Sequence, residues 1–267
     1  AVAGRFYPAR PEVLSRDLDN YLAGEKTGAE KVENAFGCVV PHAGYMYSGS
    51  VAGAVYNKLP ARPSYIILCP NHFGRGAPLA IMSSGSWRTP LGEVPVDADL
   101  ARRIKGVSHL LMEDAAAHEE EHSLEVQLPF LQRQVKQFSF VPIAIGVSGY
   151  APLEALGRAM AKVIADLPSR PLVIASSDMN HYEEDGVTRK KDRKAIDRML
   201  ELDAQGLYEV LRKEDISMCG YGPAIAMLTA ARELGVQHAE LVKYATSADA
   251  GGDRLAVVGY AGIIVSN

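Results

Sequence analysis

The chain of 267 residues has only three cysteines, and none of them belongs to a CxxC pair. A zinc ribbon or a dithiol redox motif needs such a pair, and an odd, sparse set argues against a disulfide framework. Cys38 and Cys69 fall within apolar, strand-like runs, which predicts buried small hydrophobic residues. Cys219 instead lies just before a predicted helix, whose dipole is expected to favour the thiolate.

Long apolar runs and an excess of basic charge are also missing. No run approaches the roughly 20 apolar residues that span a bilayer, and the first residues have no signal-peptide core. We therefore expect a cytoplasmic protein that does not bind a membrane. The net charge of -4 provides no broad basic surface, so we expect no nucleic-acid partner either.

Glycine-rich phosphate loops and linkers are absent as well. Neither GxGxxG nor GxxxxGK[ST] occurs, which excludes the usual glycine fingerprints for dinucleotides and nucleotide phosphates. No Pro/Gly/Ser-rich linker, repeat or low-complexity segment divides the chain, so we predict a single domain over residues 1–267. The composition, 48% hydrophobic and 22% charged, is that of a globular protein with a large core.

Apolar runs typical of strands alternate along the chain with stretches of helical spacing. Leu124, Leu128 and Leu131, for example, recur at i, i+4 and i+7 behind Ser123, which we expect to be the N-cap. This βαβ rhythm predicts an α/β fold with a mostly parallel sheet covered on both faces. We expect strands at 37–41, 65–70, 138–145, 172–176, 239–244 and within 254–265, and helices at 11–22, 50–58, 123–136, 152–166, 189–200, 204–212 and 223–234.

Residues with metal or acid–base chemistry follow three of the predicted strands. His42 and His72 each come just after an apolar run, and Asp178 and His181 follow a third. The carboxyl ends of strands in an α/β sheet meet at one edge, so these loops are expected to line one pocket. Any one of these residues alone is more often structural. Together, two histidines and the Cys219 thiolate would make an open metal site.

A second pattern is HExxH at residues 118–122. On a helix it would place His118 and His122 on one face to bind zinc, with Glu119 as the general base of a peptidase. The pattern is short, and an N-cap at Ser123 would put both histidines before the helix. A zinc peptidase is therefore the weakest of the alternatives.

Residues 41–49, Pro-His-Ala-Gly-Tyr-Met-Tyr-Ser-Gly, resemble the signature of the Memo family, known in prokaryotes as AmmeMemoRadiSam system protein B. Further landmarks of that family occur in order along nearly the whole chain. They are residues 2–8, 70–72, 87–92, 121–125, 176–178, 181–182, 219–220 and 260–261.

The resemblance implies a fold similar to that of the class III extradiol dioxygenases, a three-layer αβα sandwich that uses non-haem iron. It implies metal ligands at His42, His72 and Cys219. Cys219 stands where the dioxygenases have a carboxylate, and a thiolate shifts the preference from Fe(II) toward softer Cu(I) or Zn.

The same resemblance places three more side chains in the pocket. His181 is expected to be the acid or base, Asp178 to orient His181 or a metal ligand, and His122 to donate to a bound oxyanion. The family's system name further implies association with a radical-SAM protein and with AmmeMemoRadiSam system protein A.

Two main functions follow as expectations. The first is a redox enzyme that depends on iron or copper, with zinc as a further option. The second is a non-enzymatic binding or signalling protein whose pocket holds a small molecule, a peptide or a phosphorylated ligand.

Overall fold

The computed structural model describes residues 1–24 and 30–267, and its centre is a sheet of parallel strands. In the order β1-β8-β2-β7, these strands are β1 (Ala35–Val40), β8 (Leu172–Ser176), β2 (Ser64–Pro70) and β7 (Ser139–Ile145). Beyond β1 the sheet continues with β11 (Val257–Ser266) and then β10 (His238–Thr246), and both pairings are antiparallel. Beyond β7 it continues with β3 (Leu79–Ile81), which is antiparallel to β7, and then with β6 (Met112–Glu113), which is parallel to β3. A short strand, β9 (His181–Glu183), pairs with β11, and β4 (Ser86–Thr89) and β5 (Gly92–Pro95) form a separate hairpin.

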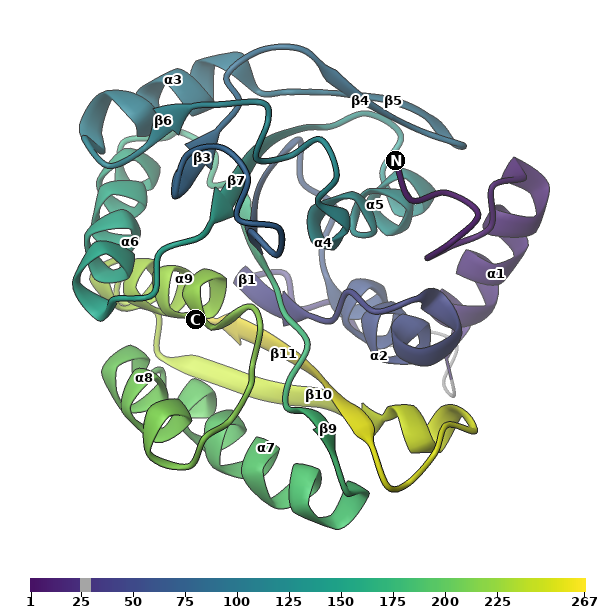
Figure 1. The fold of residues 1–267 in the computed structure, drawn as a ribbon. Coiled ribbons are helices and arrows are strands. Elements are labelled where there is room, and N and C mark those ends of the chain that lie inside the picture. The colour runs from purple at the N-terminus through teal and green to yellow at the C-terminus, as the bar shows by residue number, and fades with distance from the viewer. Residues whose placement is uncertain (25–29) are drawn as a thin grey trace.

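Helices cover both faces of this sheet, with α6 and α9 on one side and α1 and α2 on the other (Figure 1). The first layer holds α3 (Ala98–Val107), α6 (Tyr150–Ala165), α7 (Asp185–Leu200), α8 (Ala204–Lys213) and α9 (Tyr221–Glu233). The second holds α1 (Pro11–Ala23), α2 (Tyr45–Lys58), α4 (His122–Glu125) and α5 (Leu128–Gln134). The prediction of a three-layer αβα fold with a mostly parallel central sheet is confirmed. No helix among the described residues is both long enough and apolar enough to cross a bilayer.

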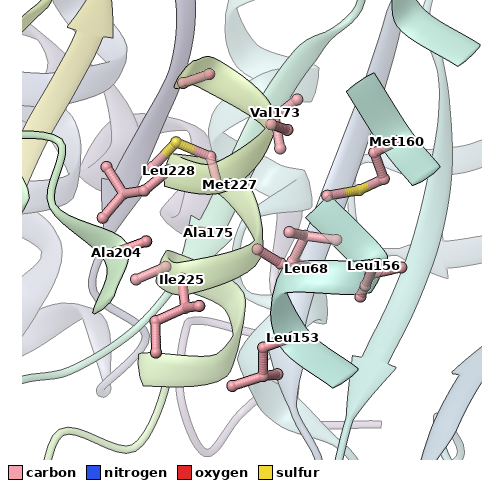
Figure 2. Close-up of a cluster of buried hydrophobic side chains, with 14 of the residues drawn as sticks. Leu68, Leu153, Leu156, Met160, Val173, Ala175, Ala204, Ile225, Met227 and Leu228 are labelled. Atoms are coloured by element: carbon pink, nitrogen blue, oxygen red, sulfur yellow. The ribbon is translucent and has the colours of Figure 1, made fainter. Parts of the chain in front are cut away.

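The central strands are buried on both faces, so their side chains feed two separate cores. Val173 and Ala175 of β8 pack in the core that contains α6 and α9, whereas Leu172 and Ile174 pack in the opposite core. Figure 2 shows part of the first core, where side chains of α6 and α9 meet those of β2 and β8. Burying each large aliphatic side chain contributes about 1.5–3 kcal/mol, so the sheet is a rigid support for the loops at its edge.

The helix predicted at 123–136 differs from the structure in its continuity and in its N-cap. The helix expected at 123–136 is two helices, α4 and α5, because Pro129 lacks an N–H and is accepted only in the first turn of α5. Ser123 is not the N-cap of α4. Glu121 takes that position, and the helix begins at His122.

Other elements have no counterpart in the prediction. The segment α3 and the short strands β3, β4, β5, β6 and β9 were not expected. The run predicted from residue 254 becomes a strand only at Val257, and the preceding residues form a loop that follows a 3-10 helix, η1 (Ser247–Ala250).

Candidate metal centre

The loops after β1, β8 and β2 lie side by side, because these three strands are parallel neighbours in the sheet. They line a cavity of about 890 Å³ at the carboxyl edge. The loop between α8 and α9 and the segment around η1 complete its wall. The six residues that the family resemblance places in the pocket all line this cavity: His42, His72, His122, Asp178, His181 and Cys219.

Three imidazoles form the floor of the cavity. One nitrogen from each of His42, His72 and His122 lies within 4.8 Å of the others, which makes the cluster a candidate metal site. The ring planes of His42 and His72 are nearly perpendicular, at 82° with centroids 5.2 Å apart. Those of His72 and His122 are stacked, at 19° with centroids 4.8 Å apart.

The tautomer of His42 follows from its partner, Ser176. The Ser176 hydroxyl donates its only proton to the carbonyl oxygen of Ser123, at 2.6 Å, and accepts from Nε2 of Gln127, at 2.8 Å. Nδ1 of His42, 3.0 Å from the same oxygen, must therefore be the donor. Burial and the neighbouring histidines lower the pKa of His42 well below its usual value. The ring is neutral, and its Nε2 carries a lone pair and no proton.

His72 is oriented by a buried carboxylate. Its backbone N–H donates to Oε2 of Glu121 at 2.7 Å, and its Nδ1 lies 2.9 Å from Oε1. The backbone N–H and hydroxyl of Ser123 also donate to Oε1. Burial raises the pKa of Glu121, but hydrogen bonds from His72 and Ser123 outweigh it and lower the pKa to about 2. Glu121 is therefore ionised, and it leaves Nε2 of His72 as the free nitrogen.

His122 has weaker polar support. Its ring stacks on Phe6 with centroids 4.3 Å apart, and its Nδ1 is 3.5 Å from Oε1 of Glu121. Burial lowers the pKa of His122 to about 4, so this ring is also neutral near pH 7.

Cys219 and Asp178 both contact His42. The Cys219 Sγ is 3.2 Å from Nε2 of His42. The Oδ1 atom of Asp178 accepts from the backbone N–H groups of His42, at 2.7 Å, and Ala43, at 3.3 Å. Burial raises the pKa of Asp178 to about 7 despite these hydrogen bonds.

The expectation that a helix dipole favours the Cys219 thiolate is not supported. The helix α9 begins at Tyr221 with Gly220 as N-cap, so Cys219 lies just outside it. Burial, reinforced by the Asp178 charge, raises the pKa of the thiol. In contrast, the buried state predicted for Cys38 and Cys69 is confirmed.

His181 faces the same cavity with a fixed tautomer. Its Nδ1 lies 3.0 Å from the carbonyl oxygen of Ser217 and must donate to it, so Nε2 is left as an acceptor. Its backbone N–H donates to Oγ of Ser217, which in turn donates to Asn180. Burial lowers the pKa of His181, which favours the neutral ring.

The residues that orient the histidines were not predicted from the sequence. Glu121, Ser176 and Gln127 are polar side chains buried behind the cavity. The spacing of the sequence does not mark them, because each acts on a residue distant in the chain. The landmarks at 121–125 and 176–178 contain Glu121 and Ser176 but gave neither of them a role.

His118, the first residue of the HExxH pattern, does not join the cluster. It lies in a turn before α4, so the helix that a zinc peptidase requires does not form over 118–122. Its ring is buried against Trp87, with centroids 5.7 Å apart, and neither ring nitrogen has a hydrogen-bond partner within the described residues.

The unpartnered ring of His118 makes the stability of the protein sensitive to pH. Burial lowers the pKa of His118 from 6.5 to about 4. Below pH 6.5 the unfolded chain therefore binds a proton that the folded chain does not, and stability falls as the pH drops toward 4. At pH 5 this costs about 2 kcal/mol relative to pH 7.5.

The change that tests this is His118→Leu. Urea unfolding at pH 7.5 and pH 5 should show that the variant loses about 2 kcal/mol less than the wild type over this interval. An identical loss in both proteins would assign the acid sensitivity to other groups.

A family model and the sequences of known relatives agree on one family. A family model described as "Memo-like protein" matches residues 1–264. A MEMO1 family protein of Methanosarcina mazei is 44% identical over 266 residues, which cover 99% of this chain and 97% of the relative. One from Pyrobaculum arsenaticum is 45% identical over 276 residues, with the same coverage of each chain. The crystal structure of an uncharacterized protein of Escherichia coli K12 has a TM-score of 0.55 at 12% identity, over 79% of this chain and 89% of that one, which shows a similar fold.

Proposed function

Because the chain belongs to the Memo family, we propose that its cavity is the metal site of a redox enzyme that uses iron or copper. The proposed ligands are Nε2 of His42, Nε2 of His72 and Sγ of Cys219. The observation that carries the proposal is the shared support of the two imidazoles. In each of them Nδ1 is held by a hydrogen-bond acceptor, which leaves Nε2 unprotonated, as is usual for metal-bound histidine.

The ring orientations select among the histidines. An imidazole nitrogen offers its lone pair in the plane of the ring, so two ligands of one ion need planes that meet near their nitrogens. The rings of His42 and His72, at 82°, can meet this condition, and so can those of His42 and His122, at 85°. The stacked rings of His72 and His122 do not, because planes at only 19° and several ångströms apart do not converge close by. Because Nδ1 of His72 lies 2.9 Å from the Glu121 carboxylate and that of His122 only 3.5 Å from it, we assign His72 as the ligand and His122 to hydrogen bonding with a bound molecule.

Cys219 supplies the third ligand in this proposal. Its sulfur already contacts Nε2 of His42, and a sulfur ligand has no ring plane to satisfy. Two nitrogens and one thiolate suit copper, zinc and, with open positions, iron. A nearby cation would favour the thiolate over the thiol and so offset the effect of burial.

A bound iron or copper ion would supply electron transfer and an open position for a small reactant. The rest of the chemistry belongs to side chains of this chain. His181 offers a neutral Nε2 that can take a proton from a bound molecule, because Ser217 keeps the other nitrogen protonated. Asp178, with a pKa near 7, can exchange a proton at Oδ2, whereas its Oδ1 holds the loop that carries His42.

The first test is elemental mass spectrometry of protein purified without oxygen. Wild type is expected to contain about one equivalent of iron or copper, and Cys219→Ser less than about a tenth of that. His122→Gln is expected to keep the metal. The loaded wild type should then consume oxygen in the presence of ascorbate, measured with an oxygen electrode.

Opposite results would redirect the assignment. Loss of metal in His122→Gln but not in Cys219→Ser would replace the proposed set with three histidines. Protein that takes up neither iron nor copper would contradict the redox enzyme. It would favour the second candidate, a binding protein for a peptide or phosphorylated ligand. That candidate is supported by the exposed rings of Tyr47 and Tyr182 at the cavity.

A further inference from the structure

Tyr182 has an unusual backbone conformation beside the cavity. Its φ is 62°, in the left-handed region that favours glycine and is unfavourable for a bulky side chain. Its side chain is also 76% exposed, so burial in the core does not offset the strain. Leu202 and Asp215 are the other non-glycine residues with positive φ in the part of the chain that the structure describes, and neither lines this cavity.

The strained residue, Tyr182, lies in a β-bulge. In the pairing of β9 with β11, Glu183 is opposite Val257 and His181 is opposite Val258. Two residues that are adjacent in β11 thus face two that are separated by Tyr182 in β9, so Tyr182 is the extra residue. A left-handed residue at such a position is usually glycine, and bulges near active sites re-aim side chains.

The bulge changes where the ring of Tyr182 lies. Successive side chains of a regular strand point to opposite faces, so the neighbours His181 and Tyr182 should be separated. Instead both line the cavity. The left-handed turn therefore brings an aromatic ring to the same side as the proposed base.

Hydrogen bonds hold the backbone that leads into this turn. The backbone N–H of Asn180 donates to the buried carboxylate of Asp192, and that of His181 donates to Ser217. The N–H of Gly259 in β11 donates to the carbonyl oxygen of Asn180. These bonds involve the residues before Tyr182, and none of them requires its side chain.

The Tyr182 side chain itself does little for the fold. Its hydroxyl makes no hydrogen bond to any described residue. Its ring has one aromatic neighbour, His181, with centroids 5.6 Å apart at 57°. A glycine would fit the same backbone without strain, so the fold does not need the tyrosine ring. The remaining role for the ring is contact with another molecule.

We propose that Tyr182 is a ligand-contacting residue whose ring stacks on a planar ring of the molecule that binds beside His181. Three further aromatic side chains line the same cavity, Phe6, Tyr47 and Tyr260, and favour a ligand of that shape. This inference rests on the proposed function, since it takes the cavity as a ligand site. It adds the class of ligand, a planar aromatic molecule, and the residue that selects it.

The test is the binding of 4-nitrophenol, measured by isothermal titration calorimetry. Tyr182→Asn removes the ring but keeps a residue that tolerates positive φ. We expect its Kd to rise roughly tenfold over wild type, the size of one aromatic contact. Tyr182→Phe keeps the ring and should bind within about twofold of wild type.

Asp215→Gly is the matched control, because it relieves a positive φ away from this cavity. Its Kd for 4-nitrophenol should equal that of wild type. Equal affinity in Tyr182→Asn, or no binding of 4-nitrophenol by wild type, would overturn the inference. Metal content measured on the same preparations separates this result from the proposed function, since the Tyr182 variants should retain as much metal as wild type.

Discussion

Replacement of His72 by alanine is expected to lower the affinity for iron or copper by at least roughly 100-fold. The substitution removes the proposed ligand Nε2. It also removes the ring N–H that donates a hydrogen bond to the buried carboxylate of Glu121. Elemental analysis after anaerobic purification, followed by titration of the metal into the stripped protein, would measure the effect.

Two further variants serve as comparisons for His72→Ala. Glu121→Gln keeps the ligand but weakens its orientation, so the affinity should fall by about 10- to 100-fold, less than in His72→Ala. His109→Ala removes an exposed histidine outside the cavity and should leave the affinity unchanged. Full metal affinity in His72→Ala would remove His72 from the ligand set.

Gly220→Ala is expected to destabilise the protein by about 3 kcal/mol. A Cβ at this position would lie 2.2 Å from the carbonyl oxygen of Ser176 and 2.5 Å from Cβ of Ser177. The φ of -95° suits any residue, so the cost is steric. Because the first clash is with backbone of β8, the loop that carries Cys219 would have to move away from the sheet.

Urea unfolding of Gly220→Ala alongside Gly106→Ala would check this expectation. Gly106 lies in α3 with no atom within 4 Å of an added Cβ. The same substitution there should stabilise the protein by up to about 1 kcal/mol, the difference in helix propensity. Equal stability of the two variants would show that the contact between the α8–α9 loop and β8 is not tight.

The fold could be predicted from the sequence where apolar runs are long enough to be buried on both faces. The runs at β2 and β8 are of this kind, and their parallel pairing follows from the helices between them. Short strands such as β3 were not predictable, because three apolar residues occur by chance in any globular chain. The split between α4 and α5 could have been seen from Pro129, which the helical spacing of the leucines concealed.

The cavity residues were predictable for a different reason. His42, His72 and Asp178 directly follow strands, and strand ends in a parallel sheet meet in space whatever their separation in the chain. The groups that set their chemistry were not predictable, since Glu121 and Ser176 act through distant contacts. The pKa of Cys219 depends on burial and on Asp178, and neither is visible in a local pattern.

The two proposed nitrogen ligands are linked through hydrogen bonds that meet at one residue, Ser123, whose hydroxyl donates to Glu121 and whose backbone carbonyl accepts from Ser176. The links run from His72 to Glu121, then to Ser123, Ser176 and His42. Because Ser123 takes part in the support of both rings, a shift of this residue would move both imidazoles, and their orientations are coupled. Substitutions of His72 and His42 should therefore be non-additive in a double-mutant cycle. The protein presents the two nitrogens as one preorganised pair of ligands.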